Sequence, residues 1–406
     1  MKFKTLLLLM TAVTCSAMSG ATELSNLEKL ERDQTIIHCL AQTARTGITD
    51  ADVLYSDDAN SNALYLIKQR HNSGAGGGLV LKVIKNPRVW GESDNEEVRL
   101  LKIFPYSQKS LKKSRRYSGV ILAEANRERL NLCVMSELDK AMHHKAVAFA
   151  SLEKVFPMIF PIHEHMGMTY VSSHSEPVPF IVTDYVMGKP LSSFYFDKVP
   201  FIDEATAVEH ISANRNEEAL NVLIENKRSA AAYSVFLQLL LALKTANEQY
   251  GFSHYDLHPG NIIIAKDNWS EGSQLSLVHP ITQEAMAVDL SGTPKVKIID
   301  LGTSAIETDN GAMISATDDK FLDRNFTKVL MLRAKSTTMK YAVLGKQVRT
   351  LSPDLSMWYL IAHHVLTNET QLSWHSDAET DFVCSDYNTC LAGYLDRAPA
   401  DMLIEQ

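Results

Sequence analysis

The sequence is short of cysteine and of net positive charge, and each shortage excludes a class of protein. Five cysteines in 406 residues are too few for a disulfide scaffold, so the fold must rest on a hydrophobic core, for which 45% hydrophobic residues is ample. A formal net charge of −8 gives no overall attraction to nucleic acids or anionic membranes. We see no internal repeat, and after residue 22 no apolar run long enough to cross a membrane. We therefore expect one two-lobed domain or two ordinary ones, with no nucleic-acid partner and no stable membrane insertion.

The first residues have the layout of a secretory signal peptide. Two lysines precede an apolar run at residues 6–13, and small residues follow, with Ala17 and Ala21 both suited to the cleavage site. The run is too short to span a bilayer. We therefore expect residues 1–21 to be removed and the mature protein to be secreted into the extracellular space, a host cell or a secretory lumen.

Export would leave four cysteines in an oxidising compartment, where disulfides are stable. Cys384 and Cys390 lie close in the sequence and form the most favourable local pair. Cys39 and Cys133 are the other two. Any bridge would be an accessory to the hydrophobic core.

The first half of the chain predicts a sheet with one inserted helix. Residues 22–62 are a mixed N-terminal extension with a helix near 24–44. Five β-rich runs follow, at residues 63–69, 79–85, 97–104, 156–166 and 179–186. Apolar residues at helical spacing predict a helix from about 120 to 145, before the fourth strand.

The second half is different. Residues 202–228 are polar and read as an insertion, and residues 231–251 form a strongly apolar helix that Gly251 can end in a left-handed conformation. Two apolar strands, NIIIA and KVKIIDLG, are separated by about thirty hydrophilic residues, and residues 352–366 read as a buried helix.

The segment FSHYDLHPGNIII, residues 252–264, places several polar side chains at the mouth of a buried strand. Such groups are costly there unless they are paired, bind a metal or take part in chemistry. Asp256 and Asn261 lie five apart across the loop and can converge with Asp300, which ends the strand of IIDLG. Oxygens from Asn261 and Asp300 suit Mg²⁺, while Asp256 stays free as a base.

A glycine-rich loop lies between the first two strands. Gly74, Gly76 and Gly78 in GAGGG let backbone N–H groups approach phosphates closely. A lysine in the third strand would then neutralise phosphate charge.

The order of these features resembles a protein-kinase-like phosphotransferase: glycine-rich loop, strand lysine, helix glutamate, hinge, H-x-D-x-x-x-x-N, then D-x-G. The resemblance spans about residues 63–366, and HYDLHPGN with IIDLG is its most specific part. It implies a bilobal α+β fold with a five-stranded N-lobe at 63–187 and a shortened, mainly helical C-lobe at 188–406. Ordinary protein kinases carry lysine where this chain has His258. A catalytic loop with histidine at this place is similar to that of aminoglycoside and choline kinases and of several atypical protein kinases.

The resemblance implies roles for individual residues. Asp256 would orient the acceptor hydroxyl, His258 would contact the γ-phosphate, and Asn261 with Asp300 would hold Mg²⁺. In the hinge TDYVMGKPL, backbone groups around Asp184 and Val186 would hold the adenine of ATP, with Thr183 as gatekeeper. His254 would support the loop, and Asp354 looks like the buried aspartate that braces it.

The lysine and its glutamate partner are ambiguous. Lys82 lies only four residues after Gly78, too close to reach back under the glycine loop, so we favour Lys102 as the phosphate-binding lysine. If GAGGG is only a hairpin turn, Lys82 becomes the candidate instead. The partner glutamate is first Glu124, second Glu128, with Glu137 as an outsider. Glu124 and Glu128 share one helix face, which the sequence cannot separate.

The chain also departs from the family. Asn261 and Asp300 are 39 positions apart, a much longer span than usual, and we expect insertions at about 197–228 and 266–294. No A-P-E triplet follows D-L-G, so activation-loop control is not expected. The expected function is an exported, ATP- and Mg²⁺-dependent phosphotransferase, an atypical Ser/Thr protein kinase acting on a protein substrate. The alternatives are a small-molecule kinase acting on a small hydroxyl compound, a pseudokinase, or a relative that transfers a nucleotidyl group.

Overall fold

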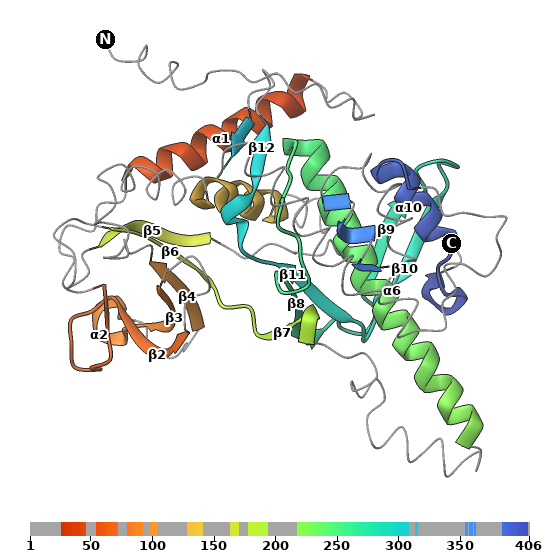
Figure 1. Cartoon of the computed structure of the whole chain (residues 1–406), viewed down its shortest axis with the longest axis horizontal. Helices are drawn as coiled ribbons and strands as arrows, with labels where there is room; N and C mark the ends of the chain where they lie inside the picture. Colours follow the sequence, from red (N-terminus) through yellow and green to blue (C-terminus); the bar gives the residue numbers. More distant parts are fainter. Residues whose placement is uncertain are drawn as a thin grey trace, which may run out of the picture.

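The computed structural model describes a mixed α+β protein (Figure 1). The described residues are 26–45, 54–71, 79–91, 98–103, 128–140, 163–169, 178–193, 217–307, 313–315, 354–355, 357–359, 361–362 and 384–404. The predicted signal peptide at 1–21 and the glycines of GAGGG lie outside these residues.

The predicted strands assemble into one sheet with strand order β1-β2-β3-β4-β6-β5. Its strands are β1 (Tyr55–Ser56), β2 (Tyr65–His71), β3 (Leu79–Lys85), β4 (Val98–Ile103), β5 (His163–Thr169) and β6 (Val178–Asp184). All neighbours are antiparallel except β1, a two-residue strand parallel to β2 that the sequence did not predict. The fourth strand begins at His163, later than the predicted 156, and five strands lie where the hydrophobic pattern placed them.

The sheet has one apolar face and one that carries the lysines. Alternate residues of β3, β4 and β6 enter a buried cluster consisting of Leu54, Tyr65, Leu81, Val83, Leu101, Ile103, Phe180 and Val182. The intervening residues point to the other face, because successive strand side chains alternate. On that face Lys102 pairs across the strands with Val80 and Ile181, and Leu100 with Lys82 and Thr183.

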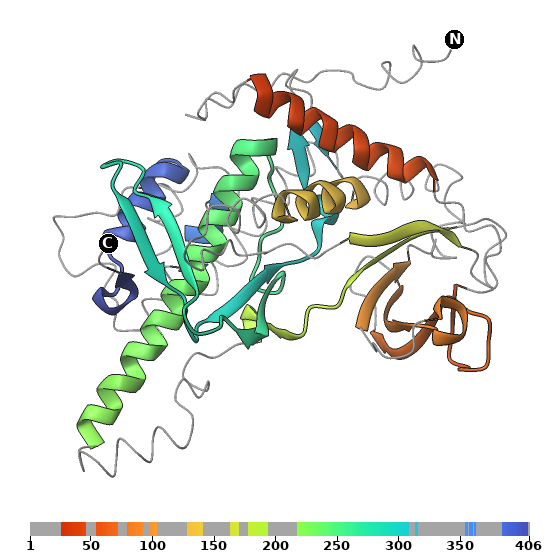
Figure 2. The same cartoon turned by 180° about the vertical axis from the view of Figure 1, so that it is seen from behind.

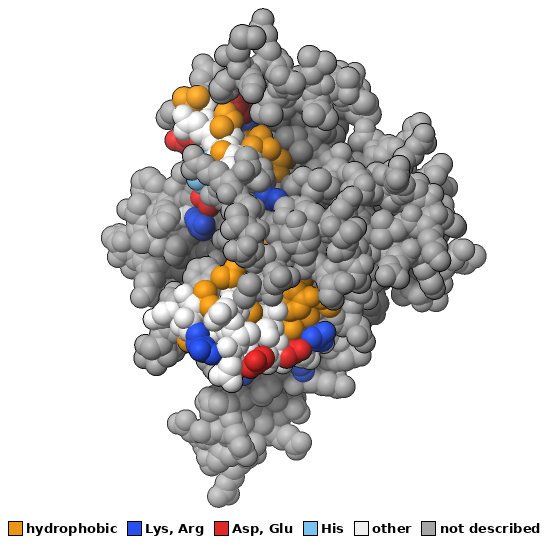
Figure 3. All heavy atoms as spheres, turned by 90° about the vertical axis from the view of Figure 1, so that its left-hand side faces the viewer, with side chains coloured by type: hydrophobic (Ala, Val, Ile, Leu, Met, Phe, Trp, Pro, Cys, Tyr) orange, Lys and Arg blue, Asp and Glu red, His pale blue; other side chains and the backbone are white. Residues whose placement is uncertain are grey.

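A short helix and an exposed ion pair cover the outer edge of this sheet. Asn86 caps α2 (Pro87–Trp90), where its side chain accepts from the Arg88 N–H. Arg70 and Asp57 form an ion pair of 2.7 Å at the surface. Acidic and basic side chains lie close together on this face (Figure 3), so the edge is a mixed, solvated surface.

The other half of the molecule packs around α6 (Glu217–Tyr250). This helix begins well before the predicted residue 231, so the last part of the predicted insertion, residues 217–228, is helical. Gly251 ends it as predicted, with φ of 55° and its N–H donating to the Asn247 carbonyl at 2.7 Å. Within the described residues, the segment Asn226–Tyr250 is long and apolar enough to cross a membrane, contrary to our expectation, and 83% of its apolar window is buried in the fold.

The predicted insertion at 266–294 is a β-hairpin. One sheet is β7 (Gly188–Pro190), β8 (Ile262–Asn268) and β11 (Pro294–Ile298); the next is β9 (Gln274–Val278), β10 (Ala285–Asp289) and β14 (Leu403–Ile404). β12 (Ala305–Glu307) pairs with β13 (Met313–Ser315). The hairpin β9–β10 is therefore fixed to the C-terminal residues and extends the chain between Asn261 and Asp300.

Two disulfides are present. Cys384 and Cys390 pair, as predicted, beside α10 (Tyr387–Leu395). Cys39 of α1 (Asn26–Arg45) pairs with Cys133 of the helix at residues 128–140. In Figures 1 and 2 this helix, drawn in gold, lies between α1 and the rest of the molecule.

Candidate active site

The loop of HYDLHPGN follows directly after α6 and is held mainly by backbone hydrogen bonds. Ser253 and Ala305 exchange two such bonds, of 3.0 and 2.8 Å, which joins the start of the loop to the segment after D-L-G. The buried carboxylate of Asp354 accepts from the N–H groups of His254 at 2.5 Å and Tyr255 at 3.0 Å. This is the bracing contact that the sequence predicts for Asp354.

Tyr255 takes a left-handed conformation, with φ of 60°. A bulky side chain is strained there, and such strain persists only where the surrounding structure fixes the backbone. Asp354 supplies that fixation, because it holds the N–H groups of two successive peptides, those of His254 and Tyr255. The loop is thus held in a conformation that it would not adopt alone.

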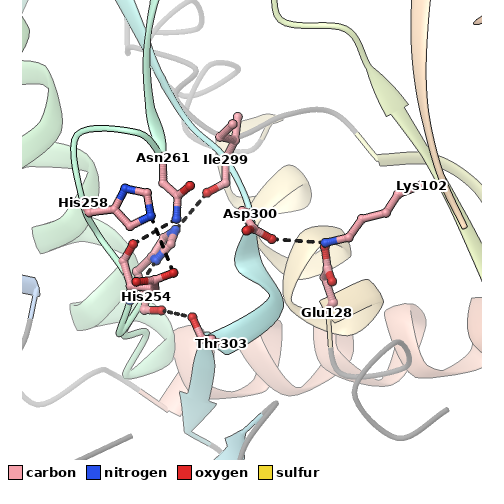
Figure 4. Close-up of polar contacts among 9 residues, drawn as sticks. Lys102, Glu128, His254, His258, Asn261, Ile299, Asp300 and Thr303 are labelled. Carbon is pink, nitrogen blue, oxygen red and sulfur yellow. Dashed lines mark hydrogen bonds and ion pairs between the residues drawn. The ribbon is translucent and has the colours of Figure 1, made fainter. Parts of the chain in front are cut away.

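His254 is fully buried and structural, as the sequence predicts. Its Nδ1 accepts from the Asp256 N–H at 3.3 Å, so Nε2 carries the proton and donates to the Ile299 carbonyl at 3.0 Å. Its own carbonyl accepts from the Thr303 hydroxyl at 3.0 Å. The imidazole and the backbone carbonyl of His254 therefore connect the loop to both ends of the D-L-G turn (Figure 4).

Asp256, His258 and Asn261 project from the same loop. The Nε2 of His258 is 3.8 Å from the Asp256 carboxylate, and its Nδ1 accepts from the Gly260 N–H at 3.0 Å. A side chain at position 260 would meet the His258 ring at 2.7 Å, so glycine is required for this close approach. Asn261 donates from Nδ2 to the Asp256 carbonyl at 3.0 Å, which directs its amide oxygen away from that carbonyl.

Asp300 lies beside Asn261 because their strands pair. β8 and β11 are antiparallel, and beyond them the Ile299 N–H donates to the Asn261 carbonyl at 2.9 Å. Asp300 itself is left-handed, with φ of 62°, and precedes the 3₁₀ turn η5 (Leu301–Thr303). The turn directs the Asp300 carboxylate towards the sheet, where Lys102 is located (Figure 4).

Lys102 connects the two halves of the site. Its Nζ donates to Glu128 at 2.6 Å and to Asp300 at 3.1 Å. Burial alone would lower the pKa of Lys102, but the two carboxylates outweigh burial and raise it. The same ammonium group lowers the pKa of Asp300, while partial burial opposes that shift. Lys102, Glu128 and Asp300 therefore form a stable triad of charges across the site.

The structure describes one of the candidate glutamates beside Lys102. Glu128, our second choice, pairs with Lys102, while Glu124, our first choice, lies outside the described residues. Glu137 pairs with Lys140 at 2.8 Å instead. Lys82 does not contact Asp300: its Nζ lies 4.5 Å from the centre of the Tyr185 ring.

The predicted glycine loop lies outside the described residues, whereas the hinge is described. Val80, near the start of β3, is the cross-strand neighbour of Lys102. Residues 185–187 join β6 to β7; Tyr185 donates its N–H to the Val98 carbonyl at 3.3 Å. The predicted adenine-binding residues, Asp184 and Val186, are half-buried at this connection.

Sequence reasoning missed Asn131, one turn after Glu128. Asn131 is fully buried and donates from Nδ2 to the Ser304 carbonyl at 2.8 Å. Glu128 also meets the turn, because a side chain at Gly302 would lie 3.1 Å from its Oε2. An asparagine between the leucines at 130 and 132 was a usable signal, since a buried amide in an apolar helix needs a partner.

The donor set is suited to a hard divalent cation. Within the described residues no three His, Cys, Asp or Glu side chains cluster as a metal site. Asn261 and Asp300 offer amide and carboxylate oxygens from adjacent strand ends, the kind of ligands that Mg²⁺ takes together with phosphate oxygens and water. Asp256 and Lys102 flank this pair. The oxygen donors of these residues therefore fit a magnesium ion.

By sequence, the chain matches no protein-family profile and no curated protein. Its function must therefore be argued from the geometry of this site.

Proposed function

We propose that this protein is an ATP- and Mg²⁺-dependent phosphotransferase with an alcohol group as acceptor, and that it acts as an atypical Ser/Thr protein kinase of bilobal fold. The observation that carries the proposal is the contact of Lys102 with both Glu128 and Asp300, at 2.6 and 3.1 Å. It brings a strand lysine, a helix carboxylate and a candidate metal ligand to one point from three distant segments. Phosphoryl transfer requires such positioning and charge neutralisation more than covalent catalysis.

In this proposal each residue of the site has one defined role. Lys102, kept protonated by its carboxylate partners, binds phosphate oxygens, and the N–H groups of residues 74–78 cover them. Asn261 and Asp300 hold Mg²⁺, which neutralises charge on the phosphates. Asp256 orients the acceptor hydroxyl and takes its proton.

His258 bears on the acceptor class. Its Nε2 faces the Asp256 carboxylate at 3.8 Å, so a protonated imidazole there can share a transferred phosphate with Lys102. The same arrangement serves a serine hydroxyl or a small alcohol. A small hydroxyl compound is therefore the second candidate acceptor.

Transfer of label from γ-labelled ATP tests the proposal. The mature chain from residue 22 is incubated with Mg²⁺, generic protein acceptors and a panel of small alcohols, beside Asp256→Asn and Asp300→Asn. Both variants should lose at least about 100-fold in rate. Lys295→Met is the control. Lys295 lies away from the site and forms an ion pair of 2.7 Å with Asp267, so this variant should keep full activity.

The destination of the label separates the candidates. Label on protein supports a protein kinase, and label on a small compound moves the assignment to a small-molecule kinase. ATP that binds independently of Mg²⁺ without any transfer would reject phosphotransfer and favour a pseudokinase or nucleotidyl transfer.

A further inference from the structure

The helix at residues 128–140 depends on its neighbours for its position. Of its thirteen residues, eleven are buried. Leu130, Val134 and Leu138 belong to the large core, while Glu128 and Asn131 reach the site. Loss of a covering element would therefore uncover part of this helix and weaken what holds it in position.

One of those covering elements is α1, which lies in the extension outside the kinase-like region (Figures 1 and 2). Among the α1 side chains that the structure describes, only Ile36 and Cys39 are buried, while Leu30 and Ile37 are 55% and 63% exposed. The Thr35 hydroxyl donates to the Glu31 carbonyl within α1 at 3.1 Å. The Cys39–Cys133 bond is the covalent attachment of α1 to the helix.

Displacement of this helix would change the site directly. Cys133 is five residues from Glu128 on the same rigid element, and between them Asn131 holds the Ser304 carbonyl at 2.8 Å. The Glu128 side chain is only 6% exposed. A carboxylate so buried needs its cation nearby. The Lys102–Glu128 ion pair therefore forms when the helix packs against the site and breaks when the helix moves away.

The disulfide itself is shielded. Cys39 and Cys133 are 0% and 2% exposed. Thiol–disulfide exchange requires access of an attacking thiolate to a sulfur atom. Once formed, the bridge is therefore protected until α1 moves away.

We propose that formation of the Cys39–Cys133 disulfide activates this site by locking the helix at 128–140 against Lys102 and the D-L-G turn. The inference rests on the proposed phosphotransferase function and adds its regulation. In oxidation, the two thiols form the S–S bond and lose two protons and two electrons to a small disulfide oxidant, which becomes two thiols. The chain is thus poorly active while reduced, in an ATP-rich cytoplasm, and becomes active in an oxidising compartment.

The test compares oxidised and reduced protein with two readouts. The protein is reduced by a dithiol, which becomes a cyclic disulfide as Cys39 and Cys133 gain two electrons and two protons. Phosphate transfer from labelled ATP is the first readout. The second needs no activity: the acetylation rate of Lys102 by a soluble acetyl ester, measured by mass spectrometry relative to Lys295.

The expected result is at least a tenfold loss of transfer on reduction, with an unchanged KM for the acceptor. Acetylation of Lys102 should become about tenfold faster, since its amino group, now held by hydrogen bonds to Glu128 and Asp300, becomes more accessible when the helix moves. Cys39→Ala with Cys133→Val should behave like reduced protein in both readouts while keeping apolar groups in the buried space. Cys384→Ser with Cys390→Ser, the matched control, should behave like oxidised wild type.

Four outcomes are decisive. Reduced protein that transfers phosphate as fast as oxidised protein would overturn the inference. Equal Lys102 acetylation in both states would do the same. Loss of near-ultraviolet circular dichroism together with activity, in reduced protein and in the Ala/Val variant alike, would show a merely structural bridge and also overturn it. If no state transfers phosphate but Lys102 acetylation still depends on the bridge, the coupling stands and the proposed function alone fails.

Discussion

The loop that carries Asp256 and the charged triad that faces it are held by different interactions. The loop is fixed by backbone groups: the Asp354 carboxylate, the His254 imidazole and the Ser253–Ala305 bridge all bind main-chain atoms. Lys102 is fixed by two carboxylates from other segments. Backbone hydrogen bonds are short-range and need no ligand, whereas charges exchange partners when a phosphate or cation arrives. The loop is thus a preformed half, and the triad is the half that can respond.

The largest effect should appear when the disulfide that supports the triad is removed and compared with removal of the disulfide at α10. The Cys39–Cys133 bridge spans 94 residues and supports the triad; Cys384–Cys390 spans 6. From chain entropy, Cys39→Ser with Cys133→Ser should lower the free energy of unfolding by about 4.6 kcal/mol and the second pair of substitutions by about 2.2 kcal/mol. Urea unfolding measures both, and equal losses would contradict this ranking.

The preformed half should depend mostly on Asp354. Asp354→Ala leaves the N–H groups of His254 and Tyr255 without their acceptor, and each buried, unpaired group costs about 1–3 kcal/mol. We expect a loss of about 3 kcal/mol in the free energy of unfolding, measured in urea. Asp401→Ala, at an exposed position, should change it by less than about 0.5 kcal/mol. A similar effect of both substitutions would mean that the loop is not braced by Asp354.

The responsive half should show its importance in rate. Glu128→Gln keeps the shape of the side chain but removes the charge that orients Lys102, so transfer should fall about 100-fold, or about 2.7 kcal/mol on the barrier. Glu137→Gln, on the same helix but paired with Lys140, is the matched control and should keep its activity. The assay is initial-rate transfer from labelled ATP. If the two variants were equally active, the triad would have no role in transfer.

The smallest effect should be a pH dependence of stability. Lys102 holds the pKa of Asp300 below its usual 3.8. A lowered folded-state pKa contributes stability that is present above the unfolded value and is lost as pH falls through the folded value. Unfolding midpoints of wild type and Asp300→Asn should therefore converge as the pH drops from about 5 to below 4. Curves that stay parallel through this range would exclude the contribution, which is small because the Asp300 side chain is 51% exposed.

Local sequence patterns predicted the elements that pack by simple periodicity. Alternating apolar residues located the strands, and Gly251 marked the end of α6. The start of α6 was missed because residues 217–228 were grouped with the acidic segment before them, although Leu220, Leu223 and Ile224 have the spacing of one helix face. The hairpin β9–β10 was also missed, since its strands are short and half-exposed.

The loop residues could be located from the motif, but the carboxylate partner of Lys102 and the Cys39–Cys133 pairing could not. Asp256, Asn261 and Asp300 occur in short segments with distinctive spacing. The choice between Glu124 and Glu128 depends on how far a helix is rotated and shifted against the sheet, which a one-turn separation does not reveal. The Cys39–Cys133 pairing likewise depends on where α1 packs, a tertiary contact between distant segments.

The same bridge has a mechanical consequence. It closes the chain between residues 39 and 133 into a ring that encloses β1, β2, β3 and β4, while β5 and β6 lie outside it. If the oxidised protein is pulled from its two ends, the force passes across the sulfur atoms and the ring stays slack. Its 94 residues then add nothing to the extension, so full unravelling falls short of that of the reduced chain by about 320 Å. Four of the six strands can lose their structure under load and still remain tethered beside their original partners.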